Sequence, residues 1–316
     1  MTRVPLAAAG ALVAVAFIWG SMVPLTALLL ERLDPLFIGA VRYVLAVPAL
    51  ALLALLGTGR LPFRRRLPWG RIALLGAVGM ALFVCCFTFG IRYSDPISAA
   101  AILCGIPVVG AIMARLVEGE RLPPRVPFAI LLAVLGGLFV AFGKPALDGT
   151  GGFRGGEFLV LGSMICWSWY SLKTRAWLAP HGMSAAEISF LTTLCGAAVL
   201  WLIYLGARLA DLSPAPAGWP GAFDWSILGW LGIACTASAI ALWNFAVSRI
   251  NLPVATIYMN LEPVFAVLIG LALGAAASGW QLLGGLVVLA GVLWVQLGDR
   301  LLRAGSGRPA PRPEAG

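Results

Sequence analysis

The sequence has little charge and few residues that could carry out acid–base chemistry. Only 11% of its 316 residues are charged, and His181 is its single histidine, whereas soluble domains carry about 25% charged residues. It has no Gly-x-x-x-x-Gly-Lys-Ser/Thr loop, which excludes ATP drive by this chain alone. It also has no His-Glu-x-x-His and no Gly-x-Ser-x-Gly motif. We therefore expect no catalytic residue, no metal and no cofactor.

Cysteine gives no sign of a disulfide framework or a metal site. All six cysteines lie inside apolar runs, and none has metal-ligand spacing with the single histidine. We interpret them as small buried hydrophobic residues. They are Cys85, Cys86, Cys104, Cys166, Cys195 and Cys235.

Long apolar runs are abundant, and 61% of the residues are hydrophobic. About 20 apolar residues suffice to cross a bilayer as a helix, and backbone groups in lipid must be satisfied within the segment. The sequence therefore predicts an all-α integral membrane protein with ten transmembrane helices. The ten runs are Leu6–Leu30, Leu36–Leu56, Trp69–Ile91, Ile97–Val117, Pro124–Phe142, Gly155–Leu172, Ala185–Leu205, Trp225–Val247, Leu252–Leu273 and Gly279–Leu297.

The distribution of Lys and Arg predicts the orientation. If the chain crosses ten times, the basic residues on the side opposite the N-terminus are only Arg32, Arg92, Lys144, Arg154 and Arg208. Positive charge collects on the cytoplasmic side of a membrane. We therefore expect a bacterial-type cell (inner) membrane protein with both termini cytoplasmic, and we attribute the net charge of +9 to this bias and not to nucleic acid.

Two stretches echo each other without a gap. Phe89–Glu120 aligns with Phe245–Ala276, and Phe245 lies 156 residues after Phe89. The echo predicts a duplication of five spans. Because five is odd, the second copy is inverted, as in many secondary transporters. The predicted units are residues 1–143 (helices 1–5), a linker at 144–154, residues 155–298 (helices 6–10) and a disordered cytoplasmic tail at 299–316.

These segments resemble the EamA-type family of the drug/metabolite transporter superfamily. The resemblance is carried by IWGSMVPL, AVRYVLAVP, DPISAAAILCGIPVVGAIMARLVEGE and NLPVATIYMNLEPVFAVLIG. It implies ten spans in two repeats, and family members export amino acids, nucleotide-type metabolites or drugs. One departure is Ala276, where the first copy has Glu120 and many members carry an acidic residue in both copies.

Two ionisable residues lie within predicted spans, where charge is costly and often functional. Arg42 is either an anion site or gate partner, or half of a structural charge pair. Glu262 is a ligand for a substrate amine or a carrier of a coupling proton. Alternatively, it is the partner of Arg42 or a cap for backbone groups freed by Pro263. The small four-helix multidrug relatives carry their proton-binding glutamate in the first helix, which here has no acidic residue before Glu31. Coupling to protons, uniport and exchange all stay open.

Paired prolines and deep polar or aromatic side chains complete the candidates. Pro107 and Pro263 occupy matching positions of the echo, and we interpret them as hinges, with a packing kink as the alternative. The aromatic and amide side chains could line a pocket, anchor the membrane interface or bridge helices. The predicted substrate-binding residues are Trp19, Ser21, Arg42, Trp167, Tyr170, Asn244, Tyr258, Asn260 and Glu262.

The function that this pattern favours is secondary transport of a small metabolite by alternating access. The predicted cargo is an amino acid or related compound, and the predicted direction is export. A flippase or scramblase of lipid or lipid-linked cargo, and an intramembrane enzyme, are the alternatives. The expected partners are a small-molecule substrate and the lipid bilayer, with a homodimer open and no nucleic acid.

Overall fold

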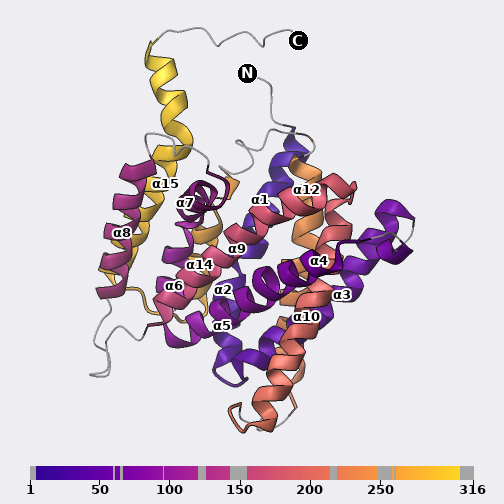
Figure 1. The fold of residues 1–316 in the computed structure, drawn as a ribbon. Coiled ribbons are helices and arrows are strands. Elements are labelled where there is room, and N and C mark those ends of the chain that lie inside the picture. The colour runs from indigo at the N-terminus through magenta and orange to yellow at the C-terminus, as the bar shows by residue number, and fades with distance from the viewer. Residues whose placement is uncertain are drawn as a thin grey trace, which may run out of the picture.

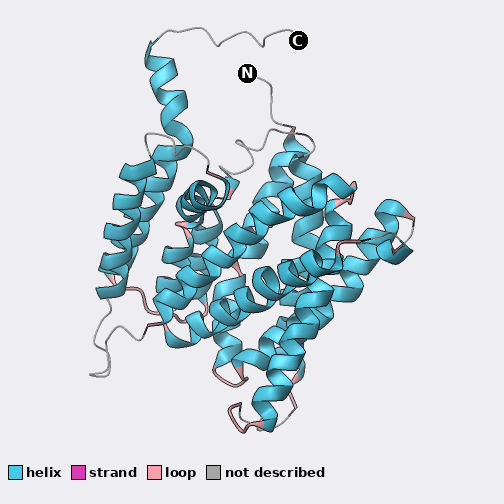
Figure 2. Ribbon diagram, viewed as in Figure 1, coloured by secondary structure: helices cyan, strands magenta, loops and turns pink. Residues whose placement is uncertain are grey.

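A computed structural model describes residues 5–59, 61–64, 67–94, 96–119, 126–142, 155–213, 219–247, 249, 258–259 and 261–306. Within these ranges every regular element is a helix (Figure 2). The predicted linker at 144–154 lies outside them, as do residues 307–316 of the predicted tail. The last helix continues to Ser306, past the predicted boundary at residue 298.

The helices follow one another along the chain in two series. The first series comprises α1 (Leu6–Gly20), α2 (Met22–Leu30), α3 (Pro35–Thr58), α4 (Trp69–Leu75), the π-helical stretch η2 (Gly76–Leu82), α5 (Phe83–Tyr93), α6 (Pro96–Leu103), α7 (Ile106–Glu118) and α8 (Val126–Phe142). The second comprises α9 (Gly156–Leu178), α10 (Ala185–Leu209), α11 (Ala222–Gly229), the π-helical stretch η4 (Trp230–Ser238), α12 (Ala239–Val247), α14 (Leu261–Ala272) and α15 (Gly279–Ser306).

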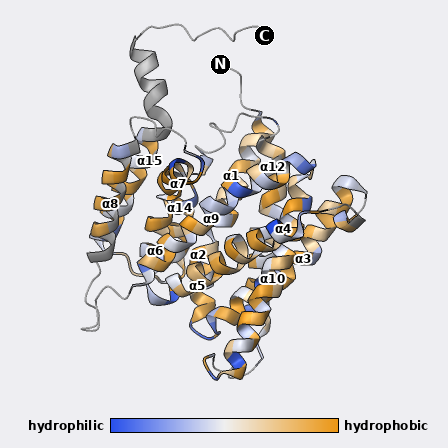
Figure 3. Ribbon diagram, viewed as in Figure 1, coloured by the Kyte–Doolittle hydropathy of each residue, from blue (hydrophilic) through white to orange (hydrophobic). Residues whose placement is uncertain are grey.

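Helix covers most of the described part of each predicted run, with breaks at Ser21 in the first run and at Cys104 and Gly105 in the fourth. Five stretches of the described chain are long and apolar enough to cross a membrane, and the bent pair α6–α7 makes a sixth if it is one span. Hydrophobic residues cover most of the length of these helices, as the orange colour in Figure 3 shows. The protein is therefore all-helical with several membrane-spanning helices.

Local signals explain where the long helices begin. Asp34 caps α3, since its carboxylate accepts hydrogen bonds from the backbone N–H groups of Leu36 (2.9 Å) and Phe37 (3.0 Å). Ser184 and Glu187 form a capping box at the start of α10, with N–O distances of 3.2 and 2.8 Å. These caps fix the starts of α3 and α10, two helices that pack against each other (Figure 1).

The fourth predicted span is bent, and the break precedes its proline. α6 and the body of α7 meet at 52°, and the chain turns at Cys104 and Gly105 between them. Pro107 therefore lies in the first turn of α7, where its missing N–H leaves no helical bond unmade. Pro263 likewise lies in the first turn of α14. Neither proline sits mid-helix, and their role as hinges stays a prediction.

In each of the two π-helical stretches, a glycine packs closely against a neighbouring helix. A Cβ atom on Gly76 would lie 2.6 Å from the Cβ of Cys195 and 2.8 Å from the carbonyl oxygen of Thr192, both on α10. Only glycine permits this approach of η2 to the α10 backbone, because these distances are shorter than real Cβ contacts.

The same contact occurs a second time in the other series. A Cβ atom on Gly232, in η4, would lie 2.8 Å from both the carbonyl oxygen of Arg42 and the Cβ of Leu45 on α3. Gly232 comes 156 residues after Gly76, and each contacted position on α3 comes 150 residues before its counterpart on α10. The two glycines therefore make matching contacts at matching positions.

Helices α8 and α15 pack along each other at one edge of the molecule (Figure 1). A Cβ atom on Gly136 would lie 2.5 Å from the carbonyl oxygen of Gly284 and 2.6 Å from the side chain of Val288. Gly136 thus permits the close contact of α8 with α15, because it has no side chain.

The glycine contacts make a stability prediction. Gly76→Ala and Gly232→Ala should each lower the free energy of unfolding by about 1–3 kcal/mol, because the added methyl group overpacks a backbone contact. The measurement is thermal unfolding of the purified protein in detergent. Gly57→Ala on α3 is the control, since a Cβ atom added there would have no neighbour within 4 Å. Equal melting temperatures for all three variants would contradict the assignment.

Candidate functional site

The break between α1 and α2 brings two predicted residues, Trp19 and Ser21, against η4. The Trp19 Nε1–H donates to the carbonyl oxygen of Cys235 (2.9 Å). The hydroxyl of Ser21 donates to the carbonyl oxygen of Ile18 (2.7 Å) and accepts from the Trp230 Nε1–H (2.8 Å). Because these bonds join polar groups at a helix break to a π-helical stretch, they satisfy backbone and side chain together.

Arg42 is buried beside this break. Its side chain is 5% exposed, one guanidinium nitrogen contacts the Sδ of Met22 at 2.9 Å, and its Nε has no hydrogen-bond partner. The guanidinium also lies 5.7 Å from the ring centre of Tyr43. In the part of the chain that the structure describes, no carboxylate lies within 4.0 Å of Arg42. The charge is held by soft and aromatic neighbours, which leaves its donors available to an anion.

Glu262 approaches the same region from α14. A Cβ atom on Gly20 would lie 2.6 Å from the Glu262 carbonyl oxygen, so the end of α1 packs on the first turn of α14. Glu262 packs on Gly20 and Arg42 contacts Met22, so the two residues meet the chain on either side of Ser21. They make no ion pair with each other, so the interpretation of Glu262 as the partner of Arg42 does not hold in this structure.

Cys235 lies at the centre of this group, and we name Trp19, Ser21, Arg42, Cys235 and Glu262 the Cys235 cluster. Its thiol donates to the carbonyl oxygen of Ile18 (3.2 Å) and contacts the Ser21 hydroxyl at 3.9 Å. The sequence alone predicts a plain buried hydrophobic residue at this position. The one sequence feature that could have singled it out is its offset: Cys235 lies 156 residues after Gly79 in η2, the same offset that relates the two similar stretches.

Trp167 and Tyr170 form a second group on α9. Their rings stack with centroids 5.6 Å apart, and Trp167 also contacts Phe83 at 5.7 Å. The Tyr170 hydroxyl and the Thr192 Oγ1 share a hydrogen bond of 3.1 Å, and the Tyr170 ring lies directly against Gly79. The structure therefore places these two predicted residues together, on the face of α9 that packs on η2.

The Tyr170–Thr192 contact has a counterpart in the other series. Tyr170 comes 148 residues after Met22, and Thr192 comes 150 residues after Arg42. The pair Met22–Arg42 joins α2 to α3, and the pair Tyr170–Thr192 joins α9 to α10. The contact in the first series joins a guanidinium group to a thioether, and the contact in the second joins two hydroxyl groups. The two series therefore differ in charge at these matching positions.

The remaining predicted residues do not join these groups. Tyr258 packs with Met259 against Leu12 and Ala246, in a separate small core between α1 and α12. Asn260 and the side chain of Asn244 lie outside the described residues. No contact given for the described residues joins Tyr258 to Glu262, and their membership of one substrate site stays a prediction.

A cavity of about 660 Å³ lies between α3, α10 and the start of α11. None of the predicted site residues lines it. Val41 and Leu45 of α3 face it, whereas Arg42 lies between them in sequence and contacts Met22 instead. We place the candidate transport site at the Cys235 cluster, because charged and deep polar side chains gather there. The cavity is a separate feature of the protein.

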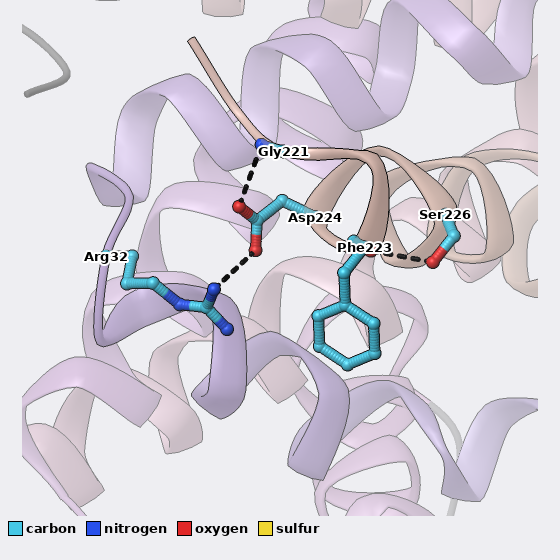
Figure 4. Close-up of polar contacts among 5 residues, drawn as sticks. All are labelled: Arg32, Gly221, Phe223, Asp224 and Ser226. Carbon is cyan, nitrogen blue, oxygen red and sulfur yellow. Dashed lines mark hydrogen bonds and ion pairs between the residues drawn. The ribbon is translucent and has the colours of Figure 1, made fainter. Parts of the chain in front are cut away.

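An ion pair joins the turn after α2 to the start of α11 (Figure 4). One guanidinium nitrogen of Arg32 lies 3.4 Å from the Asp224 carboxylate, whose other oxygen accepts a hydrogen bond from the backbone N–H of Gly221 (3.1 Å). The Arg32 side chain is 52% exposed and the Asp224 side chain 9%. The guanidinium also lies 5.9 Å from the ring centre of Phe223. The contact therefore ties the two series together at the end of the molecule where α2 and α3 meet.

A model of the EamA-like transporter family matches this sequence twice, over residues 6–142 and 154–297. The chain belongs to the EamA-like transporter family. It is a transporter and a multi-pass membrane protein, as the family match and the helices together show. Resemblance to this family was the prediction from the motifs, and it is confirmed.

Named relatives of this EamA-like chain are also transporters. It is 27% identical over 305 residues to the uncharacterized inner membrane transporter YedA of Escherichia coli K12, covering 93% of this chain and 92% of that protein. It is 23% identical over 221 residues to the uncharacterized transporter YyaM of Bacillus subtilis, covering 70% of each. It is 26% identical over 288 residues to a probable terminal-alkyne amino-acid exporter of Streptantibioticus cattleyicolor, covering 90% and 92%.

A solved crystal structure has the same fold at greater distance. It superposes with a TM-score of 0.66 at 19% identity, covering 93% of this chain and 97% of the other. This likeness extends over nearly the whole chain and concerns the fold alone.

The Arg32–Asp224 pair makes a testable prediction about stability. Arg32→Gln and Asp224→Asn keep the shape of each side chain, and the asparagine oxygen can still accept from Gly221. A double-mutant cycle measured by thermal unfolding in detergent should give a coupling free energy of about 0.5–1 kcal/mol. Ser226→Ala on the same helix turn should be additive with Arg32→Gln. If the Arg32 and Asp224 substitutions are additive as well, the ion pair contributes nothing.

Proposed function

We propose that this protein is a secondary transporter that exports a small metabolite, an amino acid or a related compound, by alternating access. Three observations support the proposal: the family membership, a relative named as a probable amino-acid exporter, and a group of buried and partly buried charged and polar side chains in a helical membrane protein. The Cys235 cluster is the observation that carries it.

The cluster offers one group for each end of an amino acid. Arg42 has no carboxylate within 4.0 Å in the described chain, so its guanidinium can bind a substrate carboxylate. Glu262 packs on Gly20, next to the same helix break, and can bind a substrate ammonium group. Trp19 and Ser21 are fixed by hydrogen bonds to η4 and would form the wall beside them. A buried charge without a partner is costly, and a zwitterionic substrate would supply both partners at once.

We further propose ten membrane spans in two inverted repeats, residues 1–143 and 155–298. The double match to one family model supports this layout. The recurrence of the glycine contact at Gly76 and Gly232 supports it too. So does the pairing of Met22–Arg42 with Tyr170–Thr192. Two halves that make the same contacts can exchange roles, which is what rocking between two open states requires.

Contacts between helices hold together the end at which α2 meets α3. There α2 packs against α5, α6 and α14, the Arg92 guanidinium donates to the Leu30 carbonyl, and Arg32 pairs with Asp224. Under the predicted orientation this is the outer end. We propose that transport opens this end and closes the opposite one.

Counterflow in proteoliposomes tests the proposed site. Vesicles loaded with one unlabelled amino acid should trap the matching labelled tracer. Arg42→Ala and Glu262→Gln should each slow trapping by about tenfold or more, since each removes a charged hydrogen bond to substrate. The controls are Arg115→Ala and Glu118→Gln, which neutralise exposed residues at the end of α7.

The counterflow results distinguish a wrong site from a wrong function. Normal trapping by the Arg42 and Glu262 variants would contradict the proposed site. Absence of trapping in the unaltered protein, across amino acids, nucleosides and cationic drugs, would contradict a metabolite carrier. Assays of lipid movement would then test the flippase or scramblase alternative.

Reporter fusions test the ten-span layout. A C-terminal green fluorescent protein should fluoresce, because it folds only in the cytoplasm, and alkaline phosphatase inserted within residues 144–154 should be active outside. The same enzyme inserted within residues 60–66 should be inactive, because an even number of crossings precedes it. An active phosphatase at both internal sites would contradict five spans per repeat.

A further inference from the structure

The cavity between α3, α10 and α11 is built like a binding site, although the proposed transport mechanism does not use it. Its volume is about 660 Å³, and Phe37, Tyr204 and Trp225 contribute aromatic surface. Val44 is 43% and Trp225 38% exposed, so the cavity is a groove open along the apolar side of the helices. We call it the α10 groove.

Two donors on α10 lack acceptors suited to them. The Nε1–H of Trp201 is buried without a hydrogen-bond partner, which is costly in an apolar wall. Arg208 donates to the carbonyl oxygen of Ser213 (2.7 Å), and no carboxylate lies within 4.0 Å of it in the described ranges. Both residues line the groove. The groove therefore offers a hydrogen-bond donor without a partner and a positive charge without a carboxylate. An anionic ligand with hydrogen-bond acceptors would complement both.

The spacing of the donors limits what fits. Trp201 and Arg208 are seven residues apart on one helix, so they are separated by about 10 Å along its axis. Arg208 lies in the last turn of a 25-residue apolar helix, at the depth of lipid headgroups. Trp201 lies two turns deeper, where the ester carbonyls and first methylenes of a phospholipid lie. A ligand with an anionic head, acceptors below it and an apolar body matches this order.

We propose that the α10 groove binds an anionic phospholipid of the surrounding bilayer. Its phosphate binds Arg208, an ester carbonyl accepts from the Trp201 Nε1–H, and an acyl chain lies along Phe37, Val44 and Trp225. The lipid would fill the space between α3 and α11, and so brace α11 close to the Arg32–Asp224 pair. This binding does not depend on the transport proposed above.

Native mass spectrometry of the purified full-length protein tests the site. The probes are phosphatidylglycerol and phosphatidylcholine with identical chains, titrated in the same detergent. Phosphatidylglycerol should occupy one site more tightly than phosphatidylcholine. Arg208→Gln should weaken its binding by about tenfold, the loss of one charged hydrogen bond, and should remove the preference between the lipids. Trp201→Phe should weaken both lipids alike, because both carry ester carbonyls.

Arg92→Gln is the matched control. Arg92 is an arginine at the same end whose guanidinium also donates to a backbone carbonyl, that of Leu30, and it does not line the groove. Lipid binding should be unchanged in this variant. Equal losses in the Arg92 and Arg208 variants, or equal affinity of the unaltered protein for both lipids, would overturn the proposal. Displacement of the lipid by millimolar glycerol phosphate would also overturn it, because the site would then bind a free phosphate ester and not a lipid.

Discussion

Hydrocarbon offers no hydrogen bonds, and this constraint governs every irregular point of the structure. Each break in a helix must satisfy its polar groups from within the protein. At the α1–α2 break the partners come from the other half of the chain, through Cys235 and Trp230. Arg42, which contacts Met22, and Glu262, which packs on Gly20, lie beside this break. The polar groups that the break needs thus lie at the proposed substrate site.

Close glycine contacts hold the centre of the bundle together. Association of helices in a membrane depends on packing and not on a hydrophobic drive, so small residues at the contact decide how near two helices come. Gly76 and Gly232 bring η2 against α10 and η4 against α3. The contact of η2 with α10 and the contact of η4 with α3 are therefore equivalent to each other. Arg42 is charged and Thr192 is not, so the two series differ in chemistry at these positions.

The sequence predicted the helices well because ten apolar runs and the capping signals at Asp34 and Ser184 are local features. It also predicted the family, through its motifs. It did not predict which helices meet, because that depends on shape matched across more than 150 residues. The contact of the Cys235 thiol with Ile18 and the packing of Tyr258 against Leu12 depend on such long-range contacts, whereas the contact of Arg42 with Met22 depends on how α2 and α3 pack. The break before Pro107 was predicted in part. The proline predicts a bend in this span, but the position of the bend follows from the turn at Gly105.

The central claim is that two matching halves open the two ends of the protein alternately. Double electron–electron resonance in nanodiscs tests it most directly, on a cysteine-free background. One spin-label pair would be placed at Glu31 and Gly221, and another at Phe63 and His181 at the opposite end. The account predicts that an added amino acid substrate lengthens the first distance and shortens the second in one population. A substrate that binds yet leaves both distances unchanged, or lengthens both together, would contradict alternating access.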